Sequence, residues 1–336
     1  MKNIIANLLT LAMAAMLCTS CVHAANEAEQ NDLDSSAVSS FIADMVRDHG
    51  FEEIRLQSIF DSAEYKQSII DAITRPAEKM PWYRYKKIFV TDDRARAGVD
   101  YWHKHADTLA DAEREFGVPT EIIVAIIGVE TRYGAYTGKY RVVDALATLA
   151  FHYPKRADFF RSELKEFLIL ARQQDVDPLS IKGSYAGAMG IPQFIASSYR
   201  NYAIDFDDDN RVDLWANDID AIGSVANYFR RHGWQPGEPV IFAVTDMPSN
   251  YTELERSELK PNIDYAQLQQ SGVEIDGTLD PDTRVALLEF EGENGPIFRL
   301  GLDNFYVITR YNHSRLYALA VYLLAQEIRE RYENLM

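Results

Sequence analysis

Apolar residues recur at helical spacing along most of the chain, and this pattern predicts a mainly helical protein. In the first amphipathic stretch, for example, Val38, Ile42 and Met45 share one face. A proline-led aromatic segment, PWYRY at 81–85, is predicted as a loop. The stretches predicted as helices are 37–46, 51–60, 92–116, 140–153, 156–173, 220–231 and 315–332.

The pattern changes after residue 235. Prolines become frequent, and short apolar runs such as 240–244 and 297–300 replace the helical spacing. We therefore expect a small β-containing insertion over 236–304, between a helical domain over 37–235 and a returning C-terminal helix in 305–336. The predicted fold class is mainly α, with some β structure (α+β).

The most apolar helix covers 119–134, PTEIIVAIIGVETRYG, and it contains a carboxylate near its end. At 3.6 residues per turn, Glu130 lies over Ile123, Ile126 and Ile127. Burial in apolar surroundings disfavours the ionised carboxylate and raises its pKa toward neutrality. A carboxyl group with such a pKa is suited to general acid catalysis.

Two interpretations of Glu130 remain open at this point. Buried Glu side chains are usually paired, so Glu130 could form a structural ion pair with Arg132 or another Arg. The alternative is an unpaired, functional acid. In either case Gly134 is expected to end the helix.

Composition narrows the classes of function. With 47% hydrophobic and 25% charged residues in 336, the chain is globular. Its net charge of -17 and the lack of any basic stripe argue against nucleic-acid binding. No organic cofactor is expected.

The N-terminus predicts export. A short positive start and an apolar run over 4–17 are typical of a signal peptide, here 1–24, and an acidic tether over 25–36 follows. Cys18 and Cys21 are the only cysteines, so no disulfide framework exists beyond the signal. Two endings stay open: acylation of Cys21 as a lipoprotein, or cleavage after Ala24.

A glycine-rich loop follows the helix at 156–173. The segment GSYAGAMGIPQF at 183–194 contains three glycines and a proline, and it offers Ser184, Tyr185 and Gln193 as polar groups. Such a loop is usually a turn, but its small residues and hydroxyl and amide groups also suit the floor of a ligand cleft.

An acidic loop, DFDDDNRVD at 205–213, has the oxygen spacing of an EF-hand. Asn210 stands at the sixth position, where Gly is usual, because Asn tolerates a left-handed backbone. The twelfth position is Ala216 in place of Glu. A solvated acidic loop is the alternative to a structural calcium site over 205–220. The expected ligands are Asp205, Asp207, Asp209, Arg211 through its carbonyl, Asp213 and Asp220.

Four separate motifs together resemble the membrane-bound lytic murein transglycosylase B family over about 76–332. The resemblance implies a lysozyme-like helical domain with a small β-containing domain and an EF-hand-like calcium loop. The motifs are GVETRYG (128–134), GSYAGAMGIPQF (183–194), DAIGSVANYF (220–229) and NFYVITRYNHS (304–314).

The resemblance also implies an activity. Members cleave the β-1,4 bond between N-acetylmuramic acid (MurNAc) and N-acetylglucosamine (GlcNAc) in peptidoglycan without water, leaving a 1,6-anhydromuramoyl end. Glu130 then serves as the single acid and base. The implied setting is the periplasm, with peptidoglycan glycan strands as partner and an outer-membrane lipid anchor if Cys21 is acylated. We expect a monomer.

The resemblance also implies which residues of this chain contact the substrate. Ser184 and Asn312 correspond to residues near the reacting sugar, and Lys155 and Arg156 to two basic residues facing the stem peptide. Phe159 replaces a cleft Tyr. The remaining cleft positions are Tyr85, Gln193, Tyr228 and Tyr311.

Two other functions remain open. A hydrolytic muramidase would need a second carboxylate beside Glu130. A calcium-stabilised peptidoglycan-binding scaffold with an inactive cleft would need none of the catalytic groups. The joint presence of Glu130, Ser184, Gln193 and Asn312 argues against the scaffold.

Overall fold

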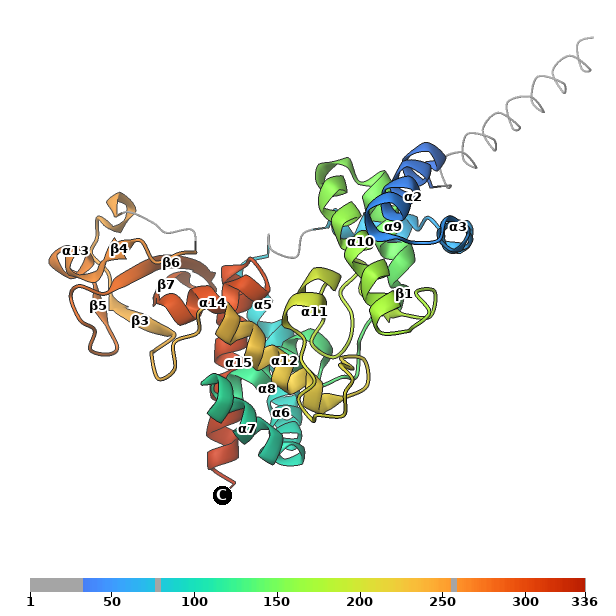
Figure 1. The fold of residues 1–336 in the computed structure, drawn as a ribbon. Coiled ribbons are helices and arrows are strands. Elements are labelled where there is room, and N and C mark those ends of the chain that lie inside the picture. The colour runs from blue at the N-terminus through green and yellow to red at the C-terminus, as the bar shows by residue number, and fades with distance from the viewer. Residues whose placement is uncertain (1–32, 76–79, 255–258, 336) are drawn as a thin grey trace, which may run out of the picture. The chain divides into compact units, whose positions relative to one another are not determined.

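The structure is a computed structural model that describes residues 33–75, 80–254 and 259–335 (Figure 1). The predicted signal, Cys21 and most of the acidic tether lie outside the described residues. Among the described helices, none combines the length and apolar character needed to span a bilayer. The chain forms two compact units, one from the described residues up to 75 with 139–187, the other from the described parts of 76–138 and 188–336.

The first unit is helical and is built around a buried helix pair, α9 and α10, which lie side by side (Figure 1). The short strands β1 and β2 pair antiparallel beside them. Asp144, 3% exposed, accepts hydrogen bonds from the Glu64 backbone N–H (3.0 Å) and from Arg141 Nε (2.8 Å), and so fixes the α3–α4 connection. The elements are α2 (Ser35–His49), α3 (Glu53–Ser62), α4 (Gln67–Ile73), β1 (Tyr140–Arg141), α9 (Val142–His152), η2 (Pro154–Arg156), α10 (Ala157–Gln173) and β2 (Lys182–Gly183).

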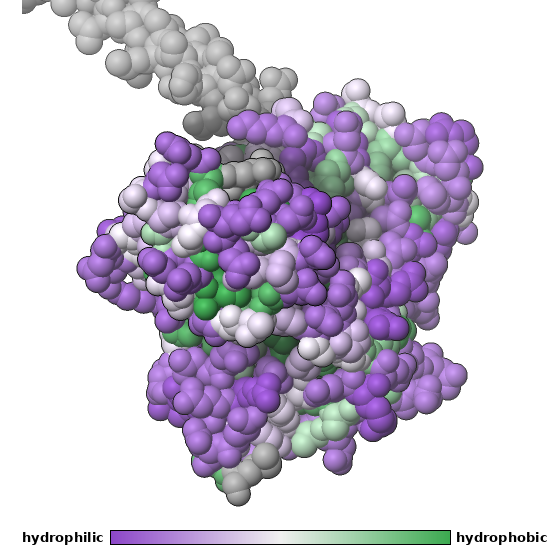
Figure 2. All heavy atoms as spheres, turned by 90° about the vertical axis from the view of Figure 1, so that its left-hand side faces the viewer, coloured by the Kyte–Doolittle hydropathy of each residue, from purple (hydrophilic) through white to green (hydrophobic). Residues whose placement is uncertain are grey.

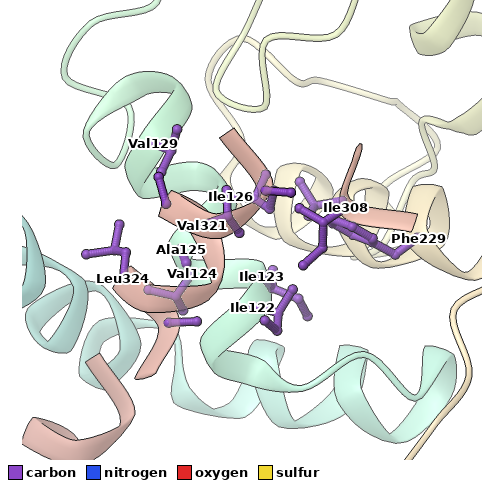
Figure 3. Packing of buried hydrophobic residues seen from close by; sticks show 14 of the residues in the cluster. Ile122, Ile123, Val124, Ala125, Ile126, Val129, Phe229, Ile308, Val321 and Leu324 are labelled. Carbon is purple, nitrogen blue, oxygen red and sulfur yellow. The ribbon is translucent and has the colours of Figure 1, made fainter. Parts of the chain in front are cut away.

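The second unit packs its helices around α8 (Thr120–Thr131). In Figure 3, isoleucines and valines of α8 meet Val321 and Leu324 of α15, and Phe229 and Ile308 approach from two further helices. The other helices of this unit are α5 (Trp82–Phe89), α6 (Asp92–Lys104), α7 (Ala106–Phe116), α11 (Ala196–Tyr202), α12 (Asp218–Arg231), α14 (Asp303–Tyr311) and α15 (Arg315–Glu333).

A five-stranded antiparallel sheet belongs to the second unit, in the order β4-β6-β7-β3-β5. Its longest pair, β6 and β7, forms a hairpin in which Gly292 faces Gly295. A small apolar core covers one face, and the surface seen in Figure 2 is largely hydrophilic with small hydrophobic patches. The elements are β3 (Ile241–Asp246), η3 (Tyr251–Glu253), β4 (Ile263–Asp264), α13 (Tyr265–Gln270), β5 (Glu274–Ile275), β6 (Arg284–Gly292) and β7 (Gly295–Gly301).

The predicted fold class is confirmed, and all strands after β2 lie within 236–304. The structure differs from the prediction at three places. Residues 37–235 are divided between the two units. The stretch 92–116 forms two helices that meet at His105, whose φ of -118° and ψ of 26° interrupt the helix. The predicted aromatic loop at 81–85 begins helix α5 instead.

The prediction at 81–85 was wrong because Pro81 was taken as a turn residue. Proline fixes φ near the helical value and is well tolerated where a helix begins. Here Pro81 is the N-cap of α5, with φ -63°, and Trp82 and Tyr85 share the inward face at 4% and 5% exposure. Tyr85 is therefore not presented to solvent by a turn.

Candidate active site

Helix α8 holds one accessible side chain, that of Glu130. The other residues of α8 are all buried, whereas Glu130 retains partial exposure. An apolar helix of this kind is stabilised by packing, so its position is set by the core around it. The carboxyl group of Glu130 is therefore held by the core of this unit, on the one residue of α8 that keeps partial exposure.

The surroundings of Glu130 favour its protonated form. Desolvation by burial raises the pKa of Glu130 to about 7. A hydrogen bond donated by the Tyr317 hydroxyl to Glu130 Oε1, 2.6 Å long, offsets part of this rise because it stabilises the carboxylate. The raised pKa predicted from the sequence is confirmed. Among the described residues Glu130 forms no ion pair, so the alternative of a structural pair with Arg132 is wrong.

Tyr317 was not found by sequence analysis. It lies in the first turn of α15, and its ring is 3% exposed. Tyr317 is one of several aromatic and apolar residues on that helix, and periodicity does not separate it from ordinary core residues. Only the three-dimensional pairing with a residue 187 positions earlier reveals its role.

The backbone immediately after Glu130 adopts an unusual conformation. Arg132, Tyr133 and Gly134 have φ values of 50°, 61° and 85°, so three successive residues are left-handed. This is unfavourable for a bulky residue such as Tyr133. Its hydroxyl donates to the Arg94 carbonyl at 2.8 Å, which holds the ring in place. The helix cap is Arg132, two residues before the predicted Gly134.

Thr131 ties the end of α8 to the glycine-rich loop. Its hydroxyl lies 2.9 Å from the Ile191 carbonyl, to which it donates, and it accepts a hydrogen bond from the Gly134 N–H at 3.0 Å. Gln193 adds a second link, since its Nε2 donates to the carbonyls of Thr137 (3.0 Å) and Gly190 (2.9 Å). The loop predicted as a cleft floor is thus fastened directly to the helix that holds Glu130.

The predicted cleft tyrosines 228 and 311 are largely committed to the protein itself. The Tyr311 hydroxyl donates to the Pro192 carbonyl and the Tyr228 hydroxyl to the Arg310 carbonyl, both at 2.6 Å. Their rings lie 4.9 Å apart, centroid to centroid. Because these hydroxyls are used as donors within the fold, their contribution is to hold the α12, α14 and glycine-loop segments together.

Asn312 differs from these tyrosines. It is exposed at the C-terminal end of α14, and it precedes Ser314, whose side chain caps α15. Asn312 and Tyr317 therefore belong to the same turn region, and the Asn312 amide is accessible to a ligand. Burial above all raises the pKa of Tyr317, and Tyr85 lies close enough to add to this rise electrostatically.

The remaining predicted substrate residues belong to the first unit. Ser184 is half-buried, and its hydroxyl accepts a hydrogen bond from the Ala186 N–H at 3.3 Å. Lys155 and Arg156 are exposed in η2. The Arg156 guanidinium lies 4.3 Å from the ring centroid of Phe159, a cation–π contact. Lys155 and Arg156 are thus available to an anionic ligand.

The acidic loop brings together three of its predicted ligands. Carboxylate oxygens of Asp205, Asp207 and Asp209 lie within 4.8 Å of one another. Asn210 adopts the left-handed conformation expected at this position, with φ 70°. Three converging carboxylates in an EF-hand-like turn match the hard oxygen ligands that calcium prefers. The residues present therefore fit a calcium ion.

Two further predicted ligands have other tasks. Asp220 is fully buried, and its two carboxylate oxygens accept hydrogen bonds from the N–H groups of Phe206 (2.8 Å) and Asp213 (2.7 Å). Asp213 in turn accepts from Trp215 and Ala216. Asp220 thus closes the loop by binding its backbone, and it does not join the cluster of three.

Comparison with known proteins places this geometry in context. The sequence model of a family described as "Transglycosylase SLT domain" matches residues 34–326. The chain is 43% identical over 302 residues to membrane-bound lytic murein transglycosylase B of Escherichia coli (strain K12), covering 86% of this chain and 81% of that protein.

Solved structures are similar over most of the chain. Soluble lytic transglycosylase SltB1 from Pseudomonas aeruginosa is 52% identical, with a TM-score of 0.83 and coverage of 88% of this chain and 99% of that one. Escherichia coli Slt35 in complex with calcium is 42% identical, with a TM-score of 0.83 and coverage of 89% and 95%. SltB3 from Pseudomonas aeruginosa in complex with NAG-anhNAM-pentapeptide is 31% identical, with a TM-score of 0.75 and coverage of 87% and 78%.

Proposed function

Because this chain belongs to the transglycosylase SLT domain family and is a lytic transglycosylase of peptidoglycan, we propose that Glu130 is its single catalytic acid and base. One observation carries the proposal. Glu130 is the only accessible side chain of a buried helix, and its pKa of about 7 allows both protonation states near neutral pH.

The proposed reaction uses Glu130 twice. As a carboxylic acid it gives its proton to the glycosidic oxygen while the bond from C1 of MurNAc to that oxygen breaks. The carbonyl oxygen of the MurNAc N-acetyl group forms a bond to C1. The C6 hydroxyl then attacks C1, the bond from the N-acetyl oxygen breaks, and the Glu130 carboxylate takes the hydroxyl proton. No water is consumed, and the product has a 1,6-anhydro ring.

Tyr317 fits this double role. Its hydroxyl donates to Glu130 Oε1, and this hydrogen bond strengthens when the carboxylate forms. Tyr317 therefore stabilises the Glu130 carboxylate after the first proton transfer, yet it still allows Glu130 to carry a proton before that step. An Arg in the same place would keep the carboxyl ionised, and the first step would lack its proton.

The hydrolytic alternative needs a second carboxylate. Inverting enzymes use it as a base for water and retaining enzymes use it as a nucleophile. Burial and the Tyr317 hydrogen bond are the causes of the shifted pKa of Glu130, and no carboxylate is among them. We therefore propose that Glu130 acts without a carboxylate partner.

Replacement of Glu130 tests the proposal. Glu130→Gln keeps the size of the side chain but removes the proton, so we expect the variant to bind sacculi and not to clear their turbidity. Glu121→Gln on the same helix is the matched control, because its carboxylate pairs with Arg329 at 3.3 Å and takes no part in the proposed chemistry. If Glu130→Gln cleared the sacculi at the wild-type rate, the assignment of Glu130 would be overturned. If the wild-type protein bound sacculi without clearing them, the scaffold function would be favoured.

We also propose that the Asp205 loop binds structural calcium, which the related Slt35 complex and the three converging carboxylates support. Calcium at a hundred times its Kd would stabilise the fold by about 2.7 kcal/mol. We expect EGTA to lower the Tm and added calcium to restore it. Asp207→Asn should abolish this response, whereas Asp208→Asn, in the same loop but outside the cluster, should retain it. The same Tm with and without EGTA would contradict the calcium site.

For the cellular location, we propose export to the periplasm with acylation of Cys21, in keeping with the membrane-bound relative. The intact mass of the mature protein distinguishes the two signal endings. A lipid-modified Cys21 supports the anchor, and a free N-terminus at Ala25 contradicts it.

We also propose five residues as substrate contacts: Ser184, Gln193, Asn312, Lys155 and Arg156.

A further inference from the structure

A groove lies where α5, β6 and the junction of α14 with α15 meet. One cavity of this groove, about 500 Å³, is lined in part by Trp82, Phe290, Glu291, Arg315 and Leu316. A second hollow of about 660 Å³ adjoins the same Glu291 and Arg315. We call the two hollows together the junction groove. Each is large enough for a ligand of several residues.

The junction groove has walls of opposite charge. Arg315 stands on the α15 wall and Glu291 on the β6 wall, and both are exposed. Within the described part of the chain, neither side chain has a hydrogen bond or ion pair, with each other or with a third group. Glu289 lines the second hollow two residues before Glu291, on the same face of β6. Both signs of charge are thus available to a ligand.

His313 adds a donor to the α15 wall. Its Nε2 lies 2.9 Å from Nη1 of Arg310. Because a guanidinium can only donate, Nε2 is the acceptor and the ring proton is on Nδ1. The floor of the groove is apolar and aromatic, since the rings of Trp82 and Phe290 meet edge to face at 5.8 Å.

The groove begins in the same helical turn as Tyr317, the residue that donates to the catalytic carboxyl. Ser314 and Arg315 line it, and Tyr317, the donor to Glu130, follows within the same first turn of α15. One turn of helix rises about 5.4 Å. The groove and the catalytic carboxyl are therefore connected through one turn of α15, with Arg315 exposed on the groove side and Tyr317 buried toward Glu130.

We propose that the junction groove binds the zwitterionic stem peptide attached to MurNAc of the glycan strand, with Arg315 receiving a peptide carboxylate and Glu291 the side-chain amine of its diamino acid. The inference rests on the proposed function. It gives the stem peptide a site in the second unit, in addition to Lys155 and Arg156 of the first unit, which the family resemblance implies. GlcNAc is uncharged, and so is a MurNAc whose lactyl carboxyl is amide-linked to a peptide, so the charges of Arg315 and Glu291 have no matched partner on the glycan itself. A short peptide with carboxylates, an amine and alanine methyl groups matches both walls and the apolar floor.

Binding to an inactive enzyme tests the groove separately from catalysis. In a Glu130→Gln background, the Kd of a GlcNAc–MurNAc tetrapeptide is compared with that of the GlcNAc–MurNAc disaccharide whose lactyl carboxyl is blocked as an uncharged amide. Because an exposed ion pair contributes up to about 1 kcal/mol, Arg315→Gln should weaken binding of the peptide-bearing ligand by about fivefold. It should leave the disaccharide unchanged. Added salt should reduce the difference by screening the charges.

Chemical modification of the ligand tests the Glu291 half. Acetylation of the diamino acid's side-chain amine should raise the Kd as much as Glu291→Gln does. The two changes together should raise the Kd no further than either change alone. The control Arg230→Gln, an exposed Arg on α12, should change neither Kd. Equal losses for both ligands with Arg315→Gln, or no loss for either, would overturn the inference. Failure of wild-type enzyme to cleave sacculi would instead refute the proposed function.

Discussion

The burial of Glu130 has a measurable thermodynamic consequence. In the unfolded chain its pKa has the ordinary value of 4.5, whereas in the folded protein it is about 7. Because the folded state binds the proton more tightly, the free energy of unfolding falls as the pH rises from 4.5 to 7. At 1.36 kcal/mol for each unit of pKa, the ionised Glu130 destabilises the fold by about 3 kcal/mol above pH 7.

Glu130→Gln removes this effect because an amide cannot ionise. At pH 4 the variant and the wild type should be about equally stable, since Glu130 is protonated in both folded and unfolded wild type. At pH 8 the variant should be more stable by up to about 3 kcal/mol. The carboxyl group needed for catalysis would then lower the free energy of unfolding at the pH where the enzyme works.

Urea unfolding at pH 4, 6 and 8 provides the assay. The difference in unfolding free energy between Glu130→Gln and wild type should grow from near zero to its full value over this range. Glu115→Gln, which changes an exposed carboxyl on α7, is the control and should show no such growth. A difference that stays constant with pH, or that favours the wild type at pH 8, would refute the reasoning from desolvation.

Two further predictions concern the groups around Glu130. Tyr317→Phe removes a hydrogen bond to a charged group, worth about 1.5–3 kcal/mol, so the pKa of Glu130 should rise by about one to two units. The alkaline limb of the pH–kcat/KM profile should move to higher pH by that amount, and an unmoved limb would contradict the bond's role. Gly128→Ala should destabilise the fold by about 1–3 kcal/mol, because its Cβ would lie 2.5 Å from the Tyr133 hydroxyl. Thermal melts would measure the loss, and an unchanged Tm would show that Tyr133 moves aside freely.

Sequence patterns predicted the helical class and the buried helix because apolar periodicity reports directly on burial. They also predicted the raised pKa of Glu130, because Ile123, Ile126 and Ile127 surround it with apolar side chains on its own helix face. Residues 81–85 were misread because a proline marks a helix start as well as a turn. The His105 break was missed because the apolar spacing of Trp102, Leu109 and Phe116 continues across it.

The parts of the site that were missed depend on contacts between distant segments. Tyr317 reaches Glu130 across 187 positions, and the hydroxyls of Tyr228 and Tyr311 turn to backbone carbonyls of other elements. Asp220 looks like a ligand by spacing, but the fold uses both its oxygens to bind the backbone of the loop. No local pattern distinguishes such uses, because they are set by tertiary packing.

The central claim is that one carboxyl group cleaves the glycan without water. Mass spectrometry of the soluble products released from purified sacculi in H₂¹⁸O tests it most directly. The account predicts 1,6-anhydromuramoyl ends, lighter by one water than the hydrolysed products and free of ¹⁸O. Reducing muramoyl ends that carry ¹⁸O at C1 would contradict it.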